Sequence, residues 1–156
     1  MYQHYDKDGM AVSLHDCYAE KAAFENGVLT FYFPDGFWIG ADHKENSTGT
    51  TVRTDASEVR FQLEFGEAED ATVYVFMEGK PGEAIRKEWK LSKLLEGINS
   101  GTYRLEFLYQ YRGYLQQNID CWLWSEKKTY HMECELRLRV KDVTYCWNRV
   151  VENRTW

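Results

Sequence analysis

Two stretches in the second half of the chain alternate between apolar and polar residues over five or six cycles, and no other feature constrains the fold as strongly. In residues 102–112 every odd position is apolar, and in residues 129–140 every even position is apolar. A period of two is typical of a β-strand with one buried face and one solvated face. The apolar positions are Tyr103, Leu105, Phe107, Tyr109 and Tyr111, and then Tyr130, Met132, Cys134, Leu136, Leu138 and Val140. The sequence therefore predicts antiparallel strands whose apolar side chains share one interior.

The pairing of these strands must place their apolar residues on the same side of the sheet. We expect residues 115–124 to pair with residues 129–138 across a four-residue loop at 125–128. The predicted cross-strand pairs are Leu123 with Tyr130, Cys121 with Met132, Ile119 with Cys134, and Leu115 with Leu138. This register makes Cys121 and Cys134 diagonal neighbours rather than direct partners.

The strands on either side of this hairpin follow from the same rule. A three-residue connection at 112–114 places Phe107 opposite Ile119. A turn at 141–142 then starts a further strand that ends at Trp147. We therefore predict a four-stranded antiparallel meander in this part of the chain.

The remaining residues agree with one all-β domain over residues 1–156. Hydrophobic residues make up 44% of the chain and aromatic residues 16%, which suits strands and supplies a sizeable core. Asn26-Gly27 between two apolar runs predicts a hairpin. Only residues 92–99 favour a helix, because Ser92 can cap it and apolar residues follow at helical spacing. We predict an antiparallel β-sandwich or flattened barrel of about nine or ten strands, with the helix closing an end or covering an edge.

Charge and hydropathy exclude several classes of protein. The formal net charge is −6, whereas nucleic-acid-binding domains are usually basic. The sequence contains neither a run of about 18 apolar residues that could span a membrane nor the basic and apolar segments of a signal peptide. We therefore expect a cytoplasmic protein that binds neither nucleic acid nor membrane. Residues 1–50 hold eight Asp and Glu against three Lys and Arg, which suits a basic partner or simply favours solubility.

The cysteines and histidines do not follow a metal-binding or disulfide pattern. Cys17, Cys121, Cys134 and Cys146 lie far apart and lack C-x-x-C spacing, so we expect reduced thiols in the core. His131 and Cys134 fall on opposite faces of the predicted strand and cannot share one ion. The sequence also lacks a Gly-rich phosphate loop and the common hydrolase motifs. We expect neither a metal nor a cofactor.

His15-Asp16-Cys17 is the one candidate catalytic group. A cysteine nucleophile needs a base within hydrogen-bonding distance, and His15 and Cys17 share one face if this segment is a strand. A histidine at a strand end, a turn-forming aspartate and a buried cysteine explain the same residues without any chemistry.

Two tryptophans on the polar side of the predicted meander are the most informative surface feature. Trp122 and Trp124 alternate with buried positions and lie on the same side as His131, Asp120 and Glu133. Tryptophan on such a face either is covered by another part of the chain or forms a binding surface for a protein or a ligand. The short helix is one segment that could cover it.

The carboxylates of this face have two interpretations. Asp120, Glu133 and Glu135 are predicted neighbours, and paired carboxylates can perform acid–base chemistry when one pKa is raised. Arg137 and Arg139 lie on the same face, so a solvated ladder of opposite charges is the simpler interpretation.

Parts of the N-terminal region suggest a family. Leu14-His15-Asp16-Cys17, the run from Phe24 to Phe31 around Asn26-Gly27, and Pro34-Asp35-Gly36 resemble small uncharacterised bacterial all-β proteins, some of which are similar to immunity proteins of toxin-secretion systems. The resemblance covers about 25 residues and supplies no functional residues. It implies a compact binder that occludes a basic toxin.

Three functions follow as hypotheses. The first is a non-enzymatic protein-interaction domain of immunity type, with a basic toxin or a homodimer mate bound at Trp122 and Trp124. The second is a small-molecule-binding β-barrel with an aromatic mouth. The third is a cysteine-dependent enzyme that uses His15 and Cys17.

Overall fold

The computed structural model describes residues 1–7, 9–127 and 130–156. In these residues the chain forms two antiparallel sheets of ten and four strands, one α-helix and one 3₁₀ turn, η1 (Ala68–Asp70). The strands and the helix are β1 (His4–Asp6), β2 (Val12–Ser13), β3 (Cys17–Ala19), β4 (Lys21–Glu25), β5 (Val28–Phe33), β6 (Trp38–Ile39), β7 (Val52–Thr54), β8 (Ser57–Leu63), β9 (Ala71–Glu78), β10 (Ala84–Trp89), α1 (Leu91–Asn99), β11 (Arg104–Gly113), β12 (Gln116–Trp124), β13 (His131–Trp147) and β14 (Val150–Thr155). The predicted all-β class is confirmed, and the molecule is a sandwich rather than a closed barrel.

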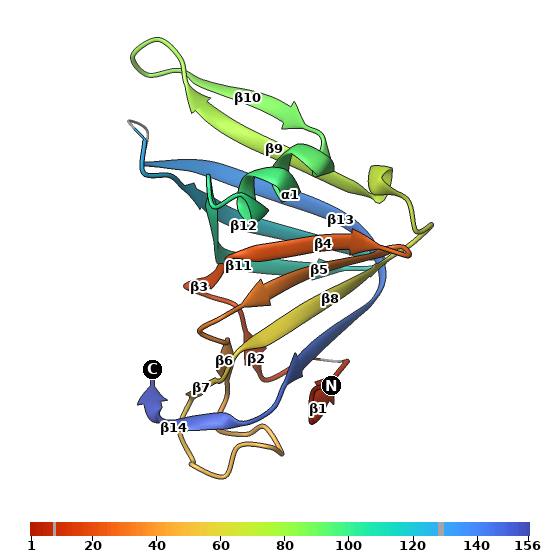
Figure 1. Ribbon diagram of the computed structural model, residues 1–156, viewed down its shortest axis with the longest axis vertical. Helices are drawn as coiled ribbons and strands as arrows, with labels where there is room; N and C mark the ends of the chain where they lie inside the picture. The colour runs from red at the N-terminus through yellow and green to blue at the C-terminus, as the bar shows by residue number, and fades with distance from the viewer. Residues whose placement is uncertain (8, 128–129) are drawn as a thin grey trace.

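The large sheet folds over itself because β13 belongs to both of its layers (Figure 1). The first part of β13 pairs with β12 and β9, and its last part pairs with β8 and β1. One layer, here called the β12 layer, has the order β10-β9-β13-β12-β11-β3. The other, the β8 layer, has the order β1-β13-β8-β5-β4. The small sheet, β14-β7-β6-β2, lies at one end of the molecule.

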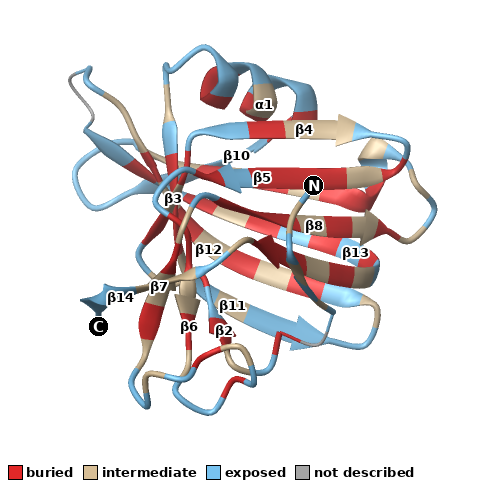
Figure 2. Ribbon diagram, turned by 60° about the horizontal axis from the view of Figure 1, so that its bottom comes forward, coloured by how far each residue is buried: buried red, intermediate tan, exposed pale blue. Residues whose placement is uncertain are grey.

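The core lies between the two layers and is strongly aromatic. Phe107 of β11 packs edge-on against Phe31 and Phe33 of β5, with ring centroids 5.3 and 5.2 Å apart. Figure 2 shows that most positions of β5 and β8 are buried. Burying such rings supplies much of the driving force for folding.

The predicted turn at 141–142 is wrong, and with it the four-stranded meander. β13 continues through this point, and its register against β8 shifts between Val140 and Asp142. Lys141-Asp142 lacks the residues that favour positive φ in a two-residue turn. The strand instead accommodates the break in alternation as a bulge, which also bends it from one layer into the other.

The predicted pairing of β12 with β13 is also wrong, by two residues. Leu123 lies opposite Met132, and Cys121 lies directly opposite Cys134. The connection between β12 and β13 is longer than the expected four residues, since β12 ends at Trp124 and β13 begins at His131. A hydrogen bond of 2.8 Å from the Ser125 amide to the Tyr130 carbonyl closes it. Two positions of the expected hairpin, 128 and 129, lie outside the described residues. A shift of two leaves the residues of β12 and of the paired part of β13 on their predicted faces. The prediction is wrong for Tyr130, which was expected in the interior but lies before β13 and is 69% exposed.

The first strand of the predicted meander differs in a way that matters for function. Phe107 lies opposite Cys121 rather than Ile119, and the register then shifts at Leu108 before Tyr109 pairs with Asp120. Because of this bulge, the odd-numbered side chains point into the core before Leu108 and away from it after Leu108. Tyr109 and Tyr111, which were expected in the core, are 56% and 57% exposed.

The helix prediction is confirmed, and α1 covers an edge of the sandwich. Its residues Leu91, Leu94 and Ile98 enter the common core. At its end the Asn99 side-chain amide donates to the Ala22 carbonyl at 2.7 Å, while its oxygen accepts from the Ala22 amide at 2.9 Å. Both backbone groups belong to β4, the edge strand of the β8 layer.

The Asn26-Gly27 hairpin is confirmed, with both residues at positive φ. In the part of the chain that the structure describes, no helix has the length and apolar character needed to cross a membrane.

Candidate functional site

The predicted binding residues Trp122, Trp124, His131, Asp120 and Glu133 come together on the outer side of the β12 layer, and we call them the Trp face. Pairing of β12 with β13 sets Trp122 beside Glu133 and Trp124 beside His131. The residues between them, such as Cys121 and Met132, are buried in the core. The alternation in the sequence is therefore the direct cause of this surface.

Three rings form the centre of the Trp face. The centroids of Trp122 and Trp124 are 5.5 Å apart and their planes are nearly perpendicular. The His131 ring lies 4.8 Å from Trp122 and 5.1 Å from Trp124. Both tryptophans are half-buried, and the histidine is exposed. The rings hold each other in place and still present area to solvent.

A buried carboxylate anchors this cluster from the side. The Trp124 indole N–H donates to Glu106 Oε2 at 2.5 Å, and Glu106 is only 6% exposed. Burial, followed by the hydrogen bond to Glu106, raises the pKa of Tyr18 to about 12. The Arg104 guanidinium lies 4.3 Å from the Tyr18 ring. Trp124 is thus fixed in orientation, as a binding anchor must be.

The carboxylates beside the tryptophans are only partly neutralised. Glu135 accepts a hydrogen bond from Arg137 at 2.6 Å, whereas Arg139 turns away to Glu64 at 2.9 Å. Asp120 and Glu133 have no ion pair within the described residues. Burial, and then the charges of Glu135 and Glu133, raise the pKa of Asp120. The expected charge ladder therefore forms at Glu135 and leaves an excess of negative charge next to Trp122.

This negative charge lines a hollow with aromatic walls. A cavity of about 310 Å³ is bounded by Phe76, Tyr109 and Trp122 and by the carboxylates of Asp120, Glu133 and Glu135. Organic cations bind between aromatic faces and carboxylates through cation–π contacts and ion pairs. Two arginines of the neighbouring strands are already engaged, since Arg86 and Arg137 stack on Tyr74 with guanidinium carbons 4.5 and 5.1 Å from its ring centre.

The α1 helix does not cover the Trp face. Its apolar residues share the core with the inward side chains of the β12 layer, so the helix lies on the opposite side of that layer. Figure 1 shows it next to β4 and β9. The possibility that the helix hides the tryptophans is therefore wrong.

His15 and Cys17 are neighbours without the geometry of a catalytic pair. The His15 imidazole Nδ1 lies 2.6 Å from the Leu108 carbonyl, and the Cys17 thiol contacts the backbone oxygen of His15 at 3.4 Å. Cys17 is fully buried, and burial raises its pKa to about 11 against the opposing effect of Arg53. A buried thiol with a raised pKa is a poor nucleophile.

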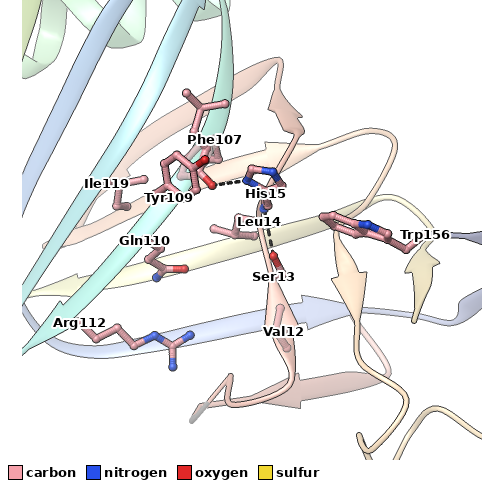
Figure 3. Close-up of a pocket in the computed structure, with 11 residues that line it drawn as sticks. Val12, Ser13, Leu14, His15, Phe107, Tyr109, Gln110, Arg112, Ile119 and Trp156 are labelled. Atoms are coloured by element: carbon pink, nitrogen blue, oxygen red, sulfur yellow. Dashed lines mark hydrogen bonds between the residues drawn. The ribbon is translucent and has the colours of Figure 1, made fainter. Parts of the chain in front are cut away.

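A second hollow, which sequence reasoning missed, lies beside His15 (Figure 3). It measures about 380 Å³ and separates residues 12–15 from residues 107–112 of β11. Its floor is apolar, and Tyr109, His15 and Trp156 stand at its rim. We call it the β2–β11 groove. No local signal marks it, because its walls come from segments far apart in the chain.

The described residues contain no group of three or more His, Cys, Asp or Glu side chains placed to hold a metal ion. Comparisons with protein-family models, with curated proteins and with solved structures find no match to this chain. The Trp face and the β2–β11 groove are therefore interpreted from their own geometry.

Proposed function

We propose that this chain is a non-enzymatic protein-binding domain, and that the Trp face contacts a basic segment of its partner. The observation that carries the proposal is the half-buried pair Trp122 and Trp124 beside Asp120 and Glu133, two carboxylates without an ion pair in the described residues.

Tryptophan and charge have complementary roles in such a surface. Trp is favoured at the energetic centre of protein interfaces because one rigid side chain buries a large area. The carboxylates attract a cation during approach and pair with it after water is displaced. Before binding, burial and then the negative charges of Glu135 and Glu133 raise the pKa of Asp120, and a partner cation would offset the contribution of those charges.

The narrower expectations remain predictions. An immunity-type role against a basic toxin requires a partner with a basic surface, whereas a homodimer mate would bring a second acidic chain of net charge −6. A small-molecule-binding barrel would need an enclosed apolar cavity, whereas the two hollows described above lie on the surface. A cysteine-dependent enzyme would need an accessible Cys17, which is buried.

Selection from a random peptide library tests the proposal directly, because the library samples basic and non-basic segments alike. We expect the wild-type protein to enrich peptides rich in Arg and Lys. Trp122→Ala should weaken the selected peptides at least about tenfold, as is typical of an interface hot spot. Glu133→Gln should weaken them less and should reduce the dependence of binding on salt.

Phe65→Ala is the matched control, because Phe65 is a 64% exposed aromatic residue outside the Trp face. This variant should bind the selected peptides as the wild type does. Enrichment without basic residues, or binding that survives Trp122→Ala, would contradict the proposal. Circular dichroism of each variant checks that it is folded.

A further inference from the structure

Three arginines of the described chain are each held between a carboxylate and an aromatic ring. In each set the carboxylate accepts a hydrogen bond from the guanidinium Nε, and the guanidinium carbon lies 4.7–5.9 Å from the ring centre. The sets are Arg60 with Glu58 and Tyr5, Arg137 with Glu135 and Tyr74, and Arg139 with Glu64 and Phe65. A guanidinium group can make both contacts at once, because it donates within its plane and stacks through its faces.

Lysine is not held in this way within the described residues. The Lys93 ammonium lies 3.9 Å from the centre of the Trp89 ring but pairs with no carboxylate there. Lys7 pairs with Asp142 at 3.2 Å but lies over no ring. An ammonium group is a compact, strongly hydrated charge without a flat face. The chain therefore combines a ring and a carboxylate around guanidinium groups.

The hollow beside Trp122 has the ring and the carboxylates of this arrangement, but within the described residues no arginine or lysine lines it. Asp120 and Trp122 are successive outward residues of β12, and Glu135 and Glu133 lie directly opposite them on β13. These four side chains form the corners of one square on the outer side of the β12 layer. Carboxylates occupy three corners, and an indole ring occupies the fourth.

Two further rings bound the hollow at its ends. Tyr109 of β11 lies directly opposite Asp120, and Phe76 of β9 lies directly opposite Glu133. The volume of about 310 Å³ is at the small end of the range for ligand pockets, which measure roughly 300–1,000 Å³, and suits a single side chain. The cluster of Trp124 and His131 lies on the other side of Trp122, away from the hollow.

No cation of the described chain completes the square. Asp120 and Glu133 form no ion pair in these residues. Their neighbours in the sheet include no arginine or lysine, and are Asn118, Tyr109, Trp122, Glu135, Phe76 and His131. The His131 ring packs on both tryptophans, and the Arg86 and Arg137 guanidinium groups lie on Tyr74. A cation in this hollow therefore has to come from another molecule.

We infer that the hollow beside Trp122 is a receptor for one arginine side chain of the partner. Its guanidinium stacks on the Trp122 ring and donates to Asp120 and Glu133, in the arrangement that this chain uses for its own arginines. This inference rests on the proposed function and names the residue by which the Trp face recognises a basic segment. A lysine could pair with one carboxylate, but it has no plane with which to stack on the indole while donating sideways.

A quaternary ammonium group is the other cation that hollows with aromatic walls hold. Such a group has no N–H to donate, so the carboxylates would act on it through charge alone. Acceptor oxygens at three corners of the square favour a guanidinium group, which has five N–H donors in fixed directions. Charge complementarity and hydrogen bonding therefore select the same occupant.

Substitutions within the peptides selected from the random library test the inference. Each arginine is replaced in turn by lysine, which keeps the charge, and by citrulline, which keeps the planar shape without the charge. Affinities for the intact chain are measured by fluorescence anisotropy. N-acetylarginine amide, N-acetyllysine amide and tetramethylammonium serve as small probes, and NMR follows the indole N–H signal of Trp122 as each is added.

At one arginine of the peptide, lysine and citrulline should each weaken binding at least about tenfold. At the other arginines, lysine should change the affinity by less than about threefold, because it keeps the charge. N-acetylarginine amide should shift the Trp122 signal at concentrations at which the other two small probes do not.

Variants of the hollow should reduce the preference for arginine over lysine. Asp120→Asn and Glu133→Gln each remove one carboxylate, which can accept two parallel hydrogen bonds from arginine, and should lower that preference at least about threefold. Glu152→Gln is the matched control, because Glu152 is an exposed carboxylate of β14 outside the Trp face. This variant should keep the full preference.

The possible failures are distinguishable. Lysine tolerated at every position, with binding still dependent on Trp122, would overturn the arginine receptor and leave the proposed function standing. A preference for arginine that both hollow variants retain in full would also overturn the receptor, as would a larger shift of the Trp122 signal with tetramethylammonium than with N-acetylarginine amide. A library that yields no basic binder would overturn the proposed function and this inference with it.

Discussion

The edge of β4 and the second half of β11 present the same physical problem and have opposite solutions. Each is a strand with backbone groups that need a partner. At β4 the chain supplies one from 77 residues away, since Asn99 bonds to both the amide and the carbonyl of Ala22. Residues 109–113 pair with no described strand other than β12, and β2 joins the small sheet instead.

The two edges of the large sheet therefore differ: a side chain from α1 bonds to the backbone of β4, whereas residues 109–113 of β11 have a described strand on one side only. Natural sheets protect their edges because unpaired strands attract other chains. In this molecule Asn99 covers one sheet edge with a specific side chain, whereas residues 109–113 pair with a described strand on one side only. The following predictions test this contrast, from the largest expected effect to the smallest.

Amide hydrogen exchange should separate the two halves of β11. Residues 105–107 lie between two strands and should exchange only with opening energies that approach global unfolding, roughly 5 kcal/mol or more. Residues 109–113 pair with a described strand on one side only and should exchange faster than residues 105–107. Equal protection from hydrogen exchange along the whole of β11 would show that its two halves do not differ in this way.

Phe107→Ala should lower the free energy of unfolding by about 3–5 kcal/mol, because its ring fills the core between Phe31 and Phe33. Tyr109→Ala, on the open half of the same strand, should change it by less than about 1 kcal/mol. Urea unfolding of both variants measures the difference. A comparable loss in Tyr109→Ala would mean that the open half is part of the stabilising core.

Asn99→Ala should lower the free energy of unfolding by about 2–4 kcal/mol, because it leaves two backbone groups of Ala22 unpaired at a covered edge. Thermal and urea unfolding measure this loss. Asn153→Ala is the control, since Asn153 is an exposed residue of β14. An unchanged stability in Asn99→Ala would show that water replaces the side chain and that this edge is not closed by it.

Asp120→Asn should raise the free energy of unfolding slightly at neutral pH, by less than about 1 kcal/mol. The pKa of Asp120 is raised in the folded protein, by burial and then by Glu135 and Glu133, so its ionised form opposes folding. The wild type becomes more stable as the pH falls through that raised pKa, because Asp120 is then protonated in the folded protein. The difference in stability between Asp120→Asn and the wild type should therefore vanish at acidic pH. Urea unfolding at several pH values tests this sign, and the same variant should bind basic peptides more weakly.

Much of the candidate site could be predicted from the sequence. The alternation placed Trp122, Trp124 and His131 outside and Cys121 and Met132 inside, as the structure has them. It could not determine which residues face each other, because a shift of two residues preserves both faces. The direct pairing of Cys121 with Cys134, both free thiols, followed only from the actual length of the connection.

The bulge at Leu108 had no signal in the hydropathy pattern. Tyr109 and Tyr111 continue the alternation, but tyrosine has an apolar ring and a polar hydroxyl and therefore occurs on both the buried and the solvated face of a sheet. The structure turns them outward and brings Gln110 and Arg112 inward to the Tyr145 hydroxyl. That polar contact came from strands far apart, so a local pattern could not reveal it.

The sequence alone determined the class of fold, the inward and outward sides of β12 and of the first part of β13, and the one helix, because these depend on local periodicity. Tertiary structure decided the register, the single long β13 and the opening beside β11. Those features depend on contacts between distant residues, such as His15 with Leu108 and Asn99 with Ala22. Hydropathy with a period of two is the same for every even shift and for every order of strands, so only packing could choose among them.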